Sequence, residues 1–531
     1  MALTEAGFRV VLLEAGSRID PAKEFHHTWP YELPFRGAGQ PGLLRKHFKG
    51  STEYNYRIMI DDRENPYTTP ADKPFHWSRS RVLGGRTLHW GRVSDRMSDH
   101  EFKAAARDGY GEEWPIAYKD IAPYYDRVER FIGVSGAPAN LPQFPDGIFL
   151  PPMPLNCAES IFEAASRKLG FPSTPRRVAQ LTRMWNNRPP CHYCGNCGNG
   201  CDVGAMFNTV AVTLPPALRT RNLTLLCDSV VSSVLMDSEN RARGVRYIER
   251  YTKRSAEVEA SVVVLAGSSL ENTRLLLNSR KGGLANSSGV LGHYLMDQVS
   301  GAGVSGFLPV LKGTAIRNDD GKAGGLYIPN FQHLGREPGA FIRGYAMSAS
   351  GGAQLFPGFA PSHAGFGSDY KKQVKHLYPA FARVWMSGGE MLARKENFVE
   401  IDPEVRDAWG IPVLRIHATH CDNDRKLYQD FFTRAQELFH AARGEPLEAE
   451  PHLAPPGSLI HETGTCRMGA DPGASVLDSY CRTHDVRNLF VFGGGCFVTT
   501  GDKHPTLTMM ALTARGCDLL IDEGRKGEYK A

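Results

Sequence analysis

The chain has 531 residues, of which 41% are hydrophobic and 22% charged, so it can bury a sizeable core and wholesale disorder is not expected. The 62 Lys and Arg residues outnumber the 57 Asp and Glu residues by only five, without any basic block, which argues against nucleic-acid binding. No apolar run reaches the ~18 residues needed to cross a bilayer. The first residues lack the charged and apolar segments of a signal peptide.

The N-terminal residues predict the second half of a dinucleotide-binding βαβ unit. Residues 2–7 are typical of a helix end with a glycine cap, and residues 8–13 (FRVVLL) of a short buried strand. Glu14 follows where an acidic residue of such a unit binds the adenosine ribose, although a strand-terminal acid is equally compatible with no such role. The first strand and its Gly-x-Gly-x-x-Gly turn belong ~20 residues earlier. We therefore expect the phosphate-binding loop to be missing from this chain.

Loops and a strand pair are expected next along the chain. Residues 18–75 and 101–205 are rich in turn-forming residues with weak periodicity, which favours irregular structure. Residues 223–236 and 244–251 predict a pair of strands.

Two further segments each predict a buried strand followed by a helix. Residues 261–266 (SVVVLA) run through Gly267 into a helix over residues 271–278. Residues 488–492 (NLFVF) run through three glycines to a helix that opens at Pro505. The dinucleotide domain is thus expected to be assembled from separated stretches of the chain.

The region between these units predicts a second domain. Residues 300–415 carry many glycines and alternating apolar stretches, which favours a largely antiparallel sheet. Residues 422–443 predict an amphipathic helix. Its apolar stripe consists of Leu427, Phe431, Ala435, Leu438 and Ala442.

Four of the eleven cysteines fall within eleven residues, at Cys191, Cys194, Cys197 and Cys201. Their spacing equals that of the ferredoxin run, except that Asp202 replaces the usual proline. Such a spacing lets thiolates surround one inorganic core. Zinc bound by four cysteines is the alternative.

Four motifs resemble the glucose–methanol–choline oxidoreductase family in identity, order and spacing, over nearly the whole chain. They are LLEAG at 12–16, RVLGGRTLHWGR at 81–92, HETGTCRMG at 461–469 and GGGCFVTTGDKHPTLTMMAL at 493–512. The cysteine-bearing insert narrows the resemblance to bacterial sugar dehydrogenases of the glucoside 3-dehydrogenase type.

The resemblance implies an α/β fold, α+β overall. A discontinuous Rossmann-like FAD-binding domain is expected over residues 1–100, 205–300 and 455–531. A cysteine-rich insert with an iron–sulfur cluster is expected over residues 101–204, and a substrate-binding domain on an antiparallel sheet over residues 301–454.

His461 and His504 match the catalytic pair of the family, whose second member is His or Asn. Oxidising a secondary alcohol removes the hydroxyl proton and a hydride from the same carbon. Histidine, with an ordinary pKa of ~6.5, can take that proton near neutrality, and a second donor can orient the oxygen and stabilise its developing charge. We expect His461 to be the base, with the opposite order left open.

The resemblance also implies a set of flavin-binding residues. The backbone at Gly84 and Gly85 allows close approach, and the N-terminus of the helix at Pro505 offers free N–H groups to the reduced flavin. Some relatives attach flavin covalently at the position of His89 and others do not. The expected FAD contacts are Glu14, Arg81, Gly84, Gly85, Thr87, His89, Trp90, Val231, Gly267, Gly494, Gly495, Pro505 and Thr506.

These features predict an FAD-dependent dehydrogenase that oxidises a ring hydroxyl of a sugar or glycoside, with C3 as the first choice. Gluconate C2 and glucose C1 are alternatives, and without the phosphate loop the chain could be a non-catalytic scaffold or electron-transfer subunit. Related dehydrogenases hold a 3Fe–4S cluster with three cysteines, matching Cys191, Cys197 and Cys201. Cys194 would permit 4Fe–4S.

A cluster that passes single electrons favours a cytochrome c-like acceptor over oxygen. Catalytic subunits of this type often pair with a small subunit that carries the export signal. A periplasmic and a cytoplasmic location therefore both stay open.

Overall fold

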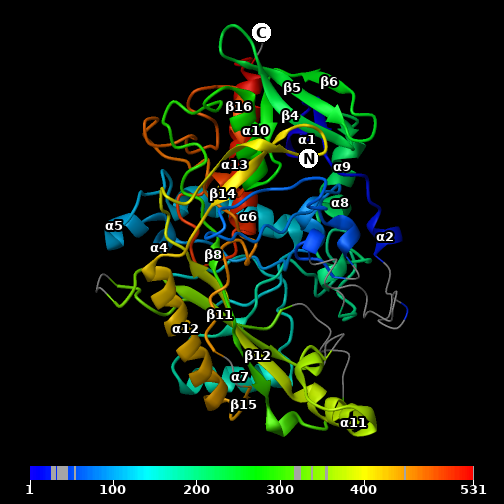
Figure 1. Ribbon diagram of the computed structural model, residues 1–531, viewed down its shortest axis with the longest axis vertical. Helices are drawn as coiled ribbons and strands as arrows, with labels where there is room; N and C mark the ends of the chain where they lie inside the picture. The colour runs from blue at the N-terminus through cyan, green and yellow to red at the C-terminus, as the bar shows by residue number, and fades with distance from the viewer. Residues whose placement is uncertain are drawn as a thin grey trace.

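The structure is a computed structural model that describes residues 1–25, 32, 46–52, 55–195, 197–315, 324–335, 339–352, 357–447 and 450–529. Its upper part, in the view of Figure 1, holds both chain termini, and its lower part holds an antiparallel sheet with its covering helices. No helix among the described residues has the length and apolarity that a membrane span requires.

Parallel strand pairs from distant parts of the chain form the upper part. β1 (Val10–Leu13) pairs with β3 (Leu223–Leu226), and β7 (Val263–Leu265) pairs with β16 (Leu489–Val491). β7 leads into α10 (Ser269–Ser279), as the sequence predicts. Each pair thus joins segments more than 200 residues apart in the chain, and the two pairs form separate two-stranded sheets.

Further elements cover this layer. The predicted strand pair is present as β4 (Ser229–Met236) and β5 (Ala242–Glu249), joined by β6 (Ser255–Glu259) in an antiparallel sheet. The C-terminal helix is α13 (Thr506–Arg525), which begins one residue after Pro505. It packs against α6 (Tyr118–Ile132) in the main core.

Two sequence expectations need correction. Residues 8–13 do contain a strand, but Val11 is 41% and Leu12 38% exposed, because β3 is the only strand paired with β1 in the described chain. Residues 101–205 are not only loops: they include α6 and α7 (Cys157–Lys168). The buried stripe of α6, with Ile121, Tyr125, Val128 and Ile132, repeats every three or four residues, which is the period of a helix with one face in the core.

The lower part is built on the predicted antiparallel sheet. Its strand order is β15-β9-β12-β11-β10-β2, with β8 paired to β12. The strands are β2 (Thr174–Pro175), β8 (Gln298–Val299), β9 (Val304–Phe307), β10 (Leu326–Ile328), β11 (Tyr345–Gly351), β12 (Phe381–Glu390) and β15 (Glu445–Pro446). The predicted amphipathic helix is α12 (Asp422–Ala441), which with α7 buries one face of this sheet.

The remaining elements are short or peripheral. The hairpin β13 (Phe398–Arg406) and β14 (Pro412–His417) packs against α10. The other α-helices are α1 (Ala2–Glu5), α2 (Pro21–Glu24), α4 (Asp99–Phe102), α5 (Ala104–Asp108), α8 (Thr209–Val212), α9 (Leu214–Arg219) and α11 (Gly367–Leu377). Single 3₁₀ turns include η4 (Gly85–Leu88), η5 (Cys197–Asn199) and η10 (Gly494–Cys496).

Candidate active site

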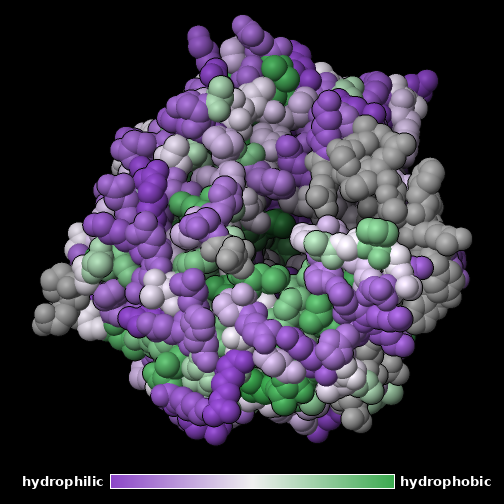
Figure 2. All heavy atoms as spheres, turned by 60° about the horizontal axis from the view of Figure 1, so that its bottom comes forward, coloured by the Kyte–Doolittle hydropathy of each residue, from purple (hydrophilic) through white to green (hydrophobic). Residues whose placement is uncertain are grey.

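His461 and His504 lie next to each other although 43 residues separate them. Their ring centroids are 5.2 Å apart and their planes meet at 78°. Both side chains keep part of their surface accessible, yet loss of water is the main factor that lowers the pKa of each. Loss of water disfavours the charged imidazole, so partial burial of both rings accounts for the direction of both shifts. Figure 2 shows the face of the lower part hollowed near its centre, with hydrophobic side chains around the hollow.

Gln298 of β8 determines the tautomer of His461. Its Nε2 donates hydrogen bonds to the carbonyls of Gly501 and Lys503, both at 2.7 Å, which orients the amide. Its Oε1 therefore faces His461 Nδ1 at 2.7 Å and can only accept a proton from it. His461 is thereby fixed with a proton on Nδ1 and a free lone pair on Nε2.

Asp95 determines the orientation of His504. Its Oδ2 lies 3.1 Å from His504 Nδ1, and the carboxylate is fully buried. The Tyr327 ring lies 6.5 Å from the His504 ring and is buried at the same place. A carboxylate at Nδ1 stabilises the doubly protonated imidazole, in which Nε2 can donate.

The electrostatic surroundings lower the pKa of both rings, and that of His461 the more. Burial lowers the pKa of His461 well below its usual value, and the charges of His504, Arg86 and Arg176 lower it further. Burial also lowers the pKa of His504, while Asp95 partly opposes this change. A neutral imidazole can accept a proton, so either ring is able to act as a base at neutral pH.

The loop that carries His461 is held at two points. Asp297 accepts hydrogen bonds from the backbone N–H groups of His461 at 2.9 Å and Leu459 at 3.1 Å. Arg86 of η4 forms a two-pronged ion pair with Glu462, at 2.6 and 3.1 Å. These contacts join the histidine loop to η4, where several flavin contacts are expected.

Glu14 lies where the βαβ reading placed it, directly after β1. Its Oε1 accepts a hydrogen bond from Gly16 N–H at 2.7 Å. Burial raises the pKa of Glu14 to about 7, although the Gly16 bond and Arg81 oppose the shift. Ser17, Arg81 and Val82 line a cavity of about 230 Å³ that Glu14 itself does not line.

The turn before η4 is open on one side. Gly84 has φ +95° and Gly85 φ +48°, and a Cβ at Gly85 would meet nothing within 4 Å. Gly493, at φ +116° before η10, also faces open space. Backbone that borders open space at two glycine turns fits a flat cofactor lying close to the chain, so the residues present fit FAD here.

The other expected flavin contacts surround this region. Thr87 hydrogen-bonds Thr209 Oγ1 at 2.9 Å, and His89 Nε2 lies 2.5 Å from Ser80 Oγ. Burial and the nearby Arg92 and Arg86 lower the pKa of His89 to about 4. Trp90 packs edge-on against Phe207, and the Arg81 guanidinium lies over the Trp409 ring.

Glycine turns and a helix start complete the set. Gly267 follows β7, and its N–H donates to Asn272 Oδ1 at 2.7 Å. Gly494 and Gly495 form η10, while Pro505 and Thr506 begin α13 directly after His504. Val231 lies on β4, paired with Tyr247 of β5. The free N–H groups of the α13 start therefore lie beside the histidine pair.

The four clustered cysteines lie near one another but do not form a ligand group. Burial, and then the thiolate charges of Cys191, Cys194 and Cys201, raise the pKa of Cys197 to about 12. Within the described ranges, no three His, Cys, Asp or Glu side chains are close enough to hold a metal ion. Cys191 packs against the apolar cluster of Val93 and also, with Cys197, against the cluster of Cys201. The expected iron–sulfur site thus has no support in this arrangement.

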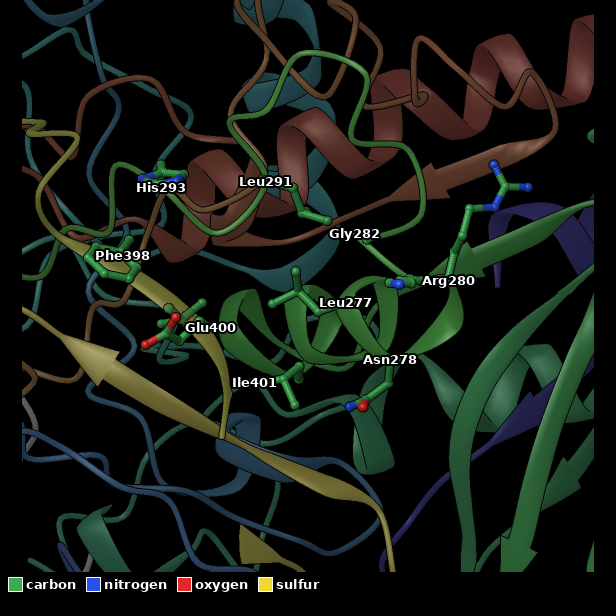
Figure 3. A pocket seen from close by; sticks show the side chains of 12 residues that line it. Leu277, Asn278, Arg280, Gly282, Leu291, His293, Phe398, Glu400 and Ile401 are labelled. Atoms are coloured by element: carbon green, nitrogen blue, oxygen red, sulfur yellow. The ribbon is translucent and has the colours of Figure 1, made fainter. Parts of the chain in front are cut away.

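A separate pocket of about 500 Å³ opens between α10 and β13. Figure 3 shows Leu277 and Ile401 along it, with His293 and Phe398 at one end and Arg280 at the other. None of the catalytic candidates lines it.

Three residues that act on the histidine pair have no direct signal in the sequence: Gln298, Asp95 and Arg176. None belongs to a motif with a known spacing, and each acts through a partner distant in the chain. Asp95 lies close after the motif at 81–92, which is the one signal that could have drawn attention to it.

Residues 65–300 match the N-terminal model of the GMC oxidoreductases, and residues 393–513 match the C-terminal model. A 2-methyl-1,2-propanediol dehydrogenase of Mycolicibacterium austroafricanum is 30% identical over 98% of this chain and 92% of its own length. The chain belongs to the GMC oxidoreductase family. GMC oxidoreductases bind FAD, so the family and the oxidoreductase class expected from the motifs are confirmed.

Two further relatives of this GMC oxidoreductase act on sugars by name. The fructose dehydrogenase large subunit of Gluconobacter japonicus is 29% identical over 99% of this chain and 95% of its own. A C-glycoside 3-oxidase of Arthrobacter globiformis is 28% identical over 95% of this chain and 86% of its own.

Proposed function

We propose that the protein is an FAD-dependent dehydrogenase that oxidises a secondary hydroxyl of a sugar or glycoside to a ketone. The observation that carries the proposal is the His461–His504 pair, with ring centroids 5.2 Å apart, in a chain of the GMC oxidoreductase family. Gln298 and Asp95 engage Nδ1 of the two rings, which leaves both Nε2 atoms for a substrate oxygen. The relatives named for fructose and C-glycosides support a sugar.

The two rings have different tasks in this proposal. Bound FAD supplies the hydride acceptor. His461 Nε2, whose lone pair is free because Gln298 holds the proton at Nδ1, accepts the hydroxyl proton of the substrate. His504 holds the same oxygen, and Asp95 stabilises the protonated form of His504 that can donate to it.

The residues proposed to hold FAD are those at the open glycine turns and their neighbours. Glu14 would bind the adenosine ribose, and the start of α13 would face the flavin ring. The remaining contacts proposed are Arg81, Gly84, Gly85, Thr87, His89, Trp90, Val231, Gly267, Gly494, Gly495, Pro505 and Thr506.

The position oxidised is proposed to be C3, and one relative is named for oxidation at that position. Gluconate C2 and glucose C1 are the competing positions. A panel of sugars, glycosides and aldonic acids, with the products assigned by NMR, separates them: a 3-keto product supports the proposal, and a 2-keto acid or a lactone contradicts it.

A second candidate function is a scaffold or electron-transfer subunit without flavin. The exposure of Val11 and Leu12 favours it, because a strand at the centre of a dinucleotide domain would be covered. A flavin absorption spectrum of the purified protein decides between the two. No flavin, and none bound on addition, would end the dehydrogenase proposal.

An iron–sulfur cluster at Cys191, Cys194, Cys197 and Cys201 is proposed from the spacing alone. The side chains as placed would have to draw together to ligate it, so no step of the mechanism depends on it. Iron and sulfide near three or four per chain would support 3Fe–4S or 4Fe–4S. Zinc, or no metal, would contradict it.

We propose partner subunits because one relative is named as the large subunit of its enzyme. A cytochrome c-like electron acceptor and a small subunit with an export signal are the expected partners, and the latter would imply a periplasmic location. Co-purification from the source cells tests both.

A further inference from the structure

The face of the antiparallel sheet opposite its helices carries an unusual charge. Along β12, Ala382, Val384 and Met386 point into the core against α12 and α7. Because side chains alternate along a strand, Arg383 and Trp385 project from the opposite face. Arg383 is exposed there and Trp385 is half-buried.

This face leads directly to the histidine pair. Trp385 pairs with Ser348 of β11, which pairs with Tyr327 of β10, beside the His504 ring. At the other end of β12, a Cβ on Gly388 would lie 2.9 Å from Gln298 Oε1, so the strand passes immediately beside the group that orients His461. Tyr327 and Ser348 are themselves buried, and Arg176 is the cation of this face whose charge acts on both histidine rings.

Arg176 crosses the same face after β2. Its Nη2 donates to Ser387 Oγ at 2.6 Å, and its guanidinium carbon lies 5.5 Å from the Trp385 ring centroid. The Arg383 guanidinium carbon lies 4.9 Å from the same ring. Trp385 thus holds two cations by its π face without neutralising either.

Neither guanidinium has an ion-pair partner in the part of the chain that the structure describes. Partial loss of water lowers the pKa of Arg383, although its side chain keeps exposed surface. Burial lowers the pKa of Arg176, Asp95 opposes that shift most strongly, and the charge of Arg383 adds to it. The nearest carboxylates to Arg176 have other tasks, since Asp95 holds His504 and Glu159 caps α7.

Two partly desolvated arginines that lack an ion-pair partner can together bind an anion. Arginine donors match the planar, two-oxygen geometry of a carboxylate, and such charge-assisted bonds are strong. We propose that Arg176 and Arg383, held by Trp385, bind a carboxylate of the sugar substrate, so that the protein oxidises acidic sugars in preference to neutral ones. This inference rests on the proposed function and names its substrate class.

The test measures anaerobic reduction of the flavin in the FAD-loaded protein, which yields a Kd for each sugar. The probes are matched pairs: gluconate with sorbitol, and methyl glucuronoside with methyl glucoside, with glucose 6-phosphate as a second anion. We expect the carboxylates to bind about tenfold or more tighter than their neutral partners, which corresponds to one or two charge-assisted bonds. Arg383→Met should remove about tenfold of that preference and leave the Kd of neutral sugars within twofold.

Arg383→Lys should retain part of the preference, because the charge stays and the fork is lost. Arg406→Met, on the exposed end of β13, is the matched control and should change neither Kd. Three results would overturn this inference but not the proposed function. Acidic and neutral sugars could bind equally, the phosphate could bind more tightly than any carboxylate, or Arg383→Met could affect both members of a pair equally. If no sugar of either kind reduces the flavin, the proposed function fails as well.

Discussion

Gln298 controls the chemistry of His461 although it lies 163 residues earlier in the chain. The two carbonyls that receive its Nε2 protons belong to the segment that leads to His504. One amide therefore ties the position of both histidines together. Its effect is on protonation and orientation, since Gln298 itself cannot take the proton.

Replacing Gln298 by Leu tests this positioning role. The variant keeps the side-chain volume but releases His461 Nδ1 and the two carbonyls, so we expect kcat to fall about tenfold or more while KM changes little. Stopped-flow flavin reduction measures the step. Gln298→Glu is the companion variant, because its carboxylate can accept from Nδ1 but cannot donate to the carbonyls. Unchanged kcat in both variants would contradict the role.

The pH dependence follows from the lowered pKa values of the two histidines. The base must be neutral to accept a proton, and burial lowers both pKa values, so the neutral form persists to more acidic pH than for an exposed imidazole. We expect the acid limb of kcat/KM for a neutral sugar, where His461 becomes protonated, to lie below pH ~6.5. An acid limb centred above pH 7 would show that the rings are not desolvated.

The Asp95→Asn variant tests how Asp95 contributes to the pH dependence. Asp95 raises the pKa of His504 against the effect of burial, so its loss should lower this pKa further and weaken the donor role of His504. We expect kcat to fall without an alkaline shift of the acid limb. A limb that moves to higher pH would mean that Asp95 does not stabilise the protonated ring.

The sequence predicts His461 and His504 because each lies in a motif of fixed spacing. It has no comparable signal for Gln298, Asp95 or Arg176, whose roles arise only when β8, the segment after η4 and β2 are brought together by the fold. Contacts between residues more than 100 positions apart leave no periodicity in a single chain.

At the scale of elements, η10 shows how tightly the histidine loop is packed. A Cβ on Gly494 would lie 2.7 Å from the carbonyl oxygen of Glu462, next to His461. Backbone cannot yield as a flexible side chain does, so Gly494→Ala should displace this loop. We expect turnover to fall at least tenfold with the fold retained by circular dichroism.

Gly358→Ala is the matched control, because a Cβ there meets nothing within 4 Å and φ is ordinary. It should leave turnover unchanged. If Gly494→Ala is equally harmless, the packing of η10 on the histidine loop is not required for activity.

Apolar periodicity in the sequence predicts helices such as α12, whereas residue composition alone does not predict α6. The stripe on α12 is buried in the structure as the sequence indicates. The stripe on α6 stands among turn-forming residues whose composition favours loops, so the composition of this region does not indicate the helix. The strand at residues 8–13 was found, but its exposure depends on neighbours that its own sequence does not specify.

At the scale of the whole molecule, the proposed active site lies where the two parts meet. β8 lies in the middle of Figure 1, between α13 above and the antiparallel sheet below. The upper part contributes both histidines through α13 and the loop at 461, while the lower part contributes the charged face of β12. The sequence predicts both parts, but their relative placement depends on long-range packing.

The most direct test of the central claim is anaerobic flavin reduction by a sugar panel in the wild-type protein and in His461→Ala. We expect both proteins to retain flavin, and the sugars to reduce it in the wild type. The flavin of His461→Ala should be reduced by the sugar at least a hundredfold more slowly, since the base is lost. His417→Ala, on β14, should show the wild-type rate of flavin reduction. Flavin that no sugar reduces, or equal rates in wild type and His461→Ala, would contradict the account.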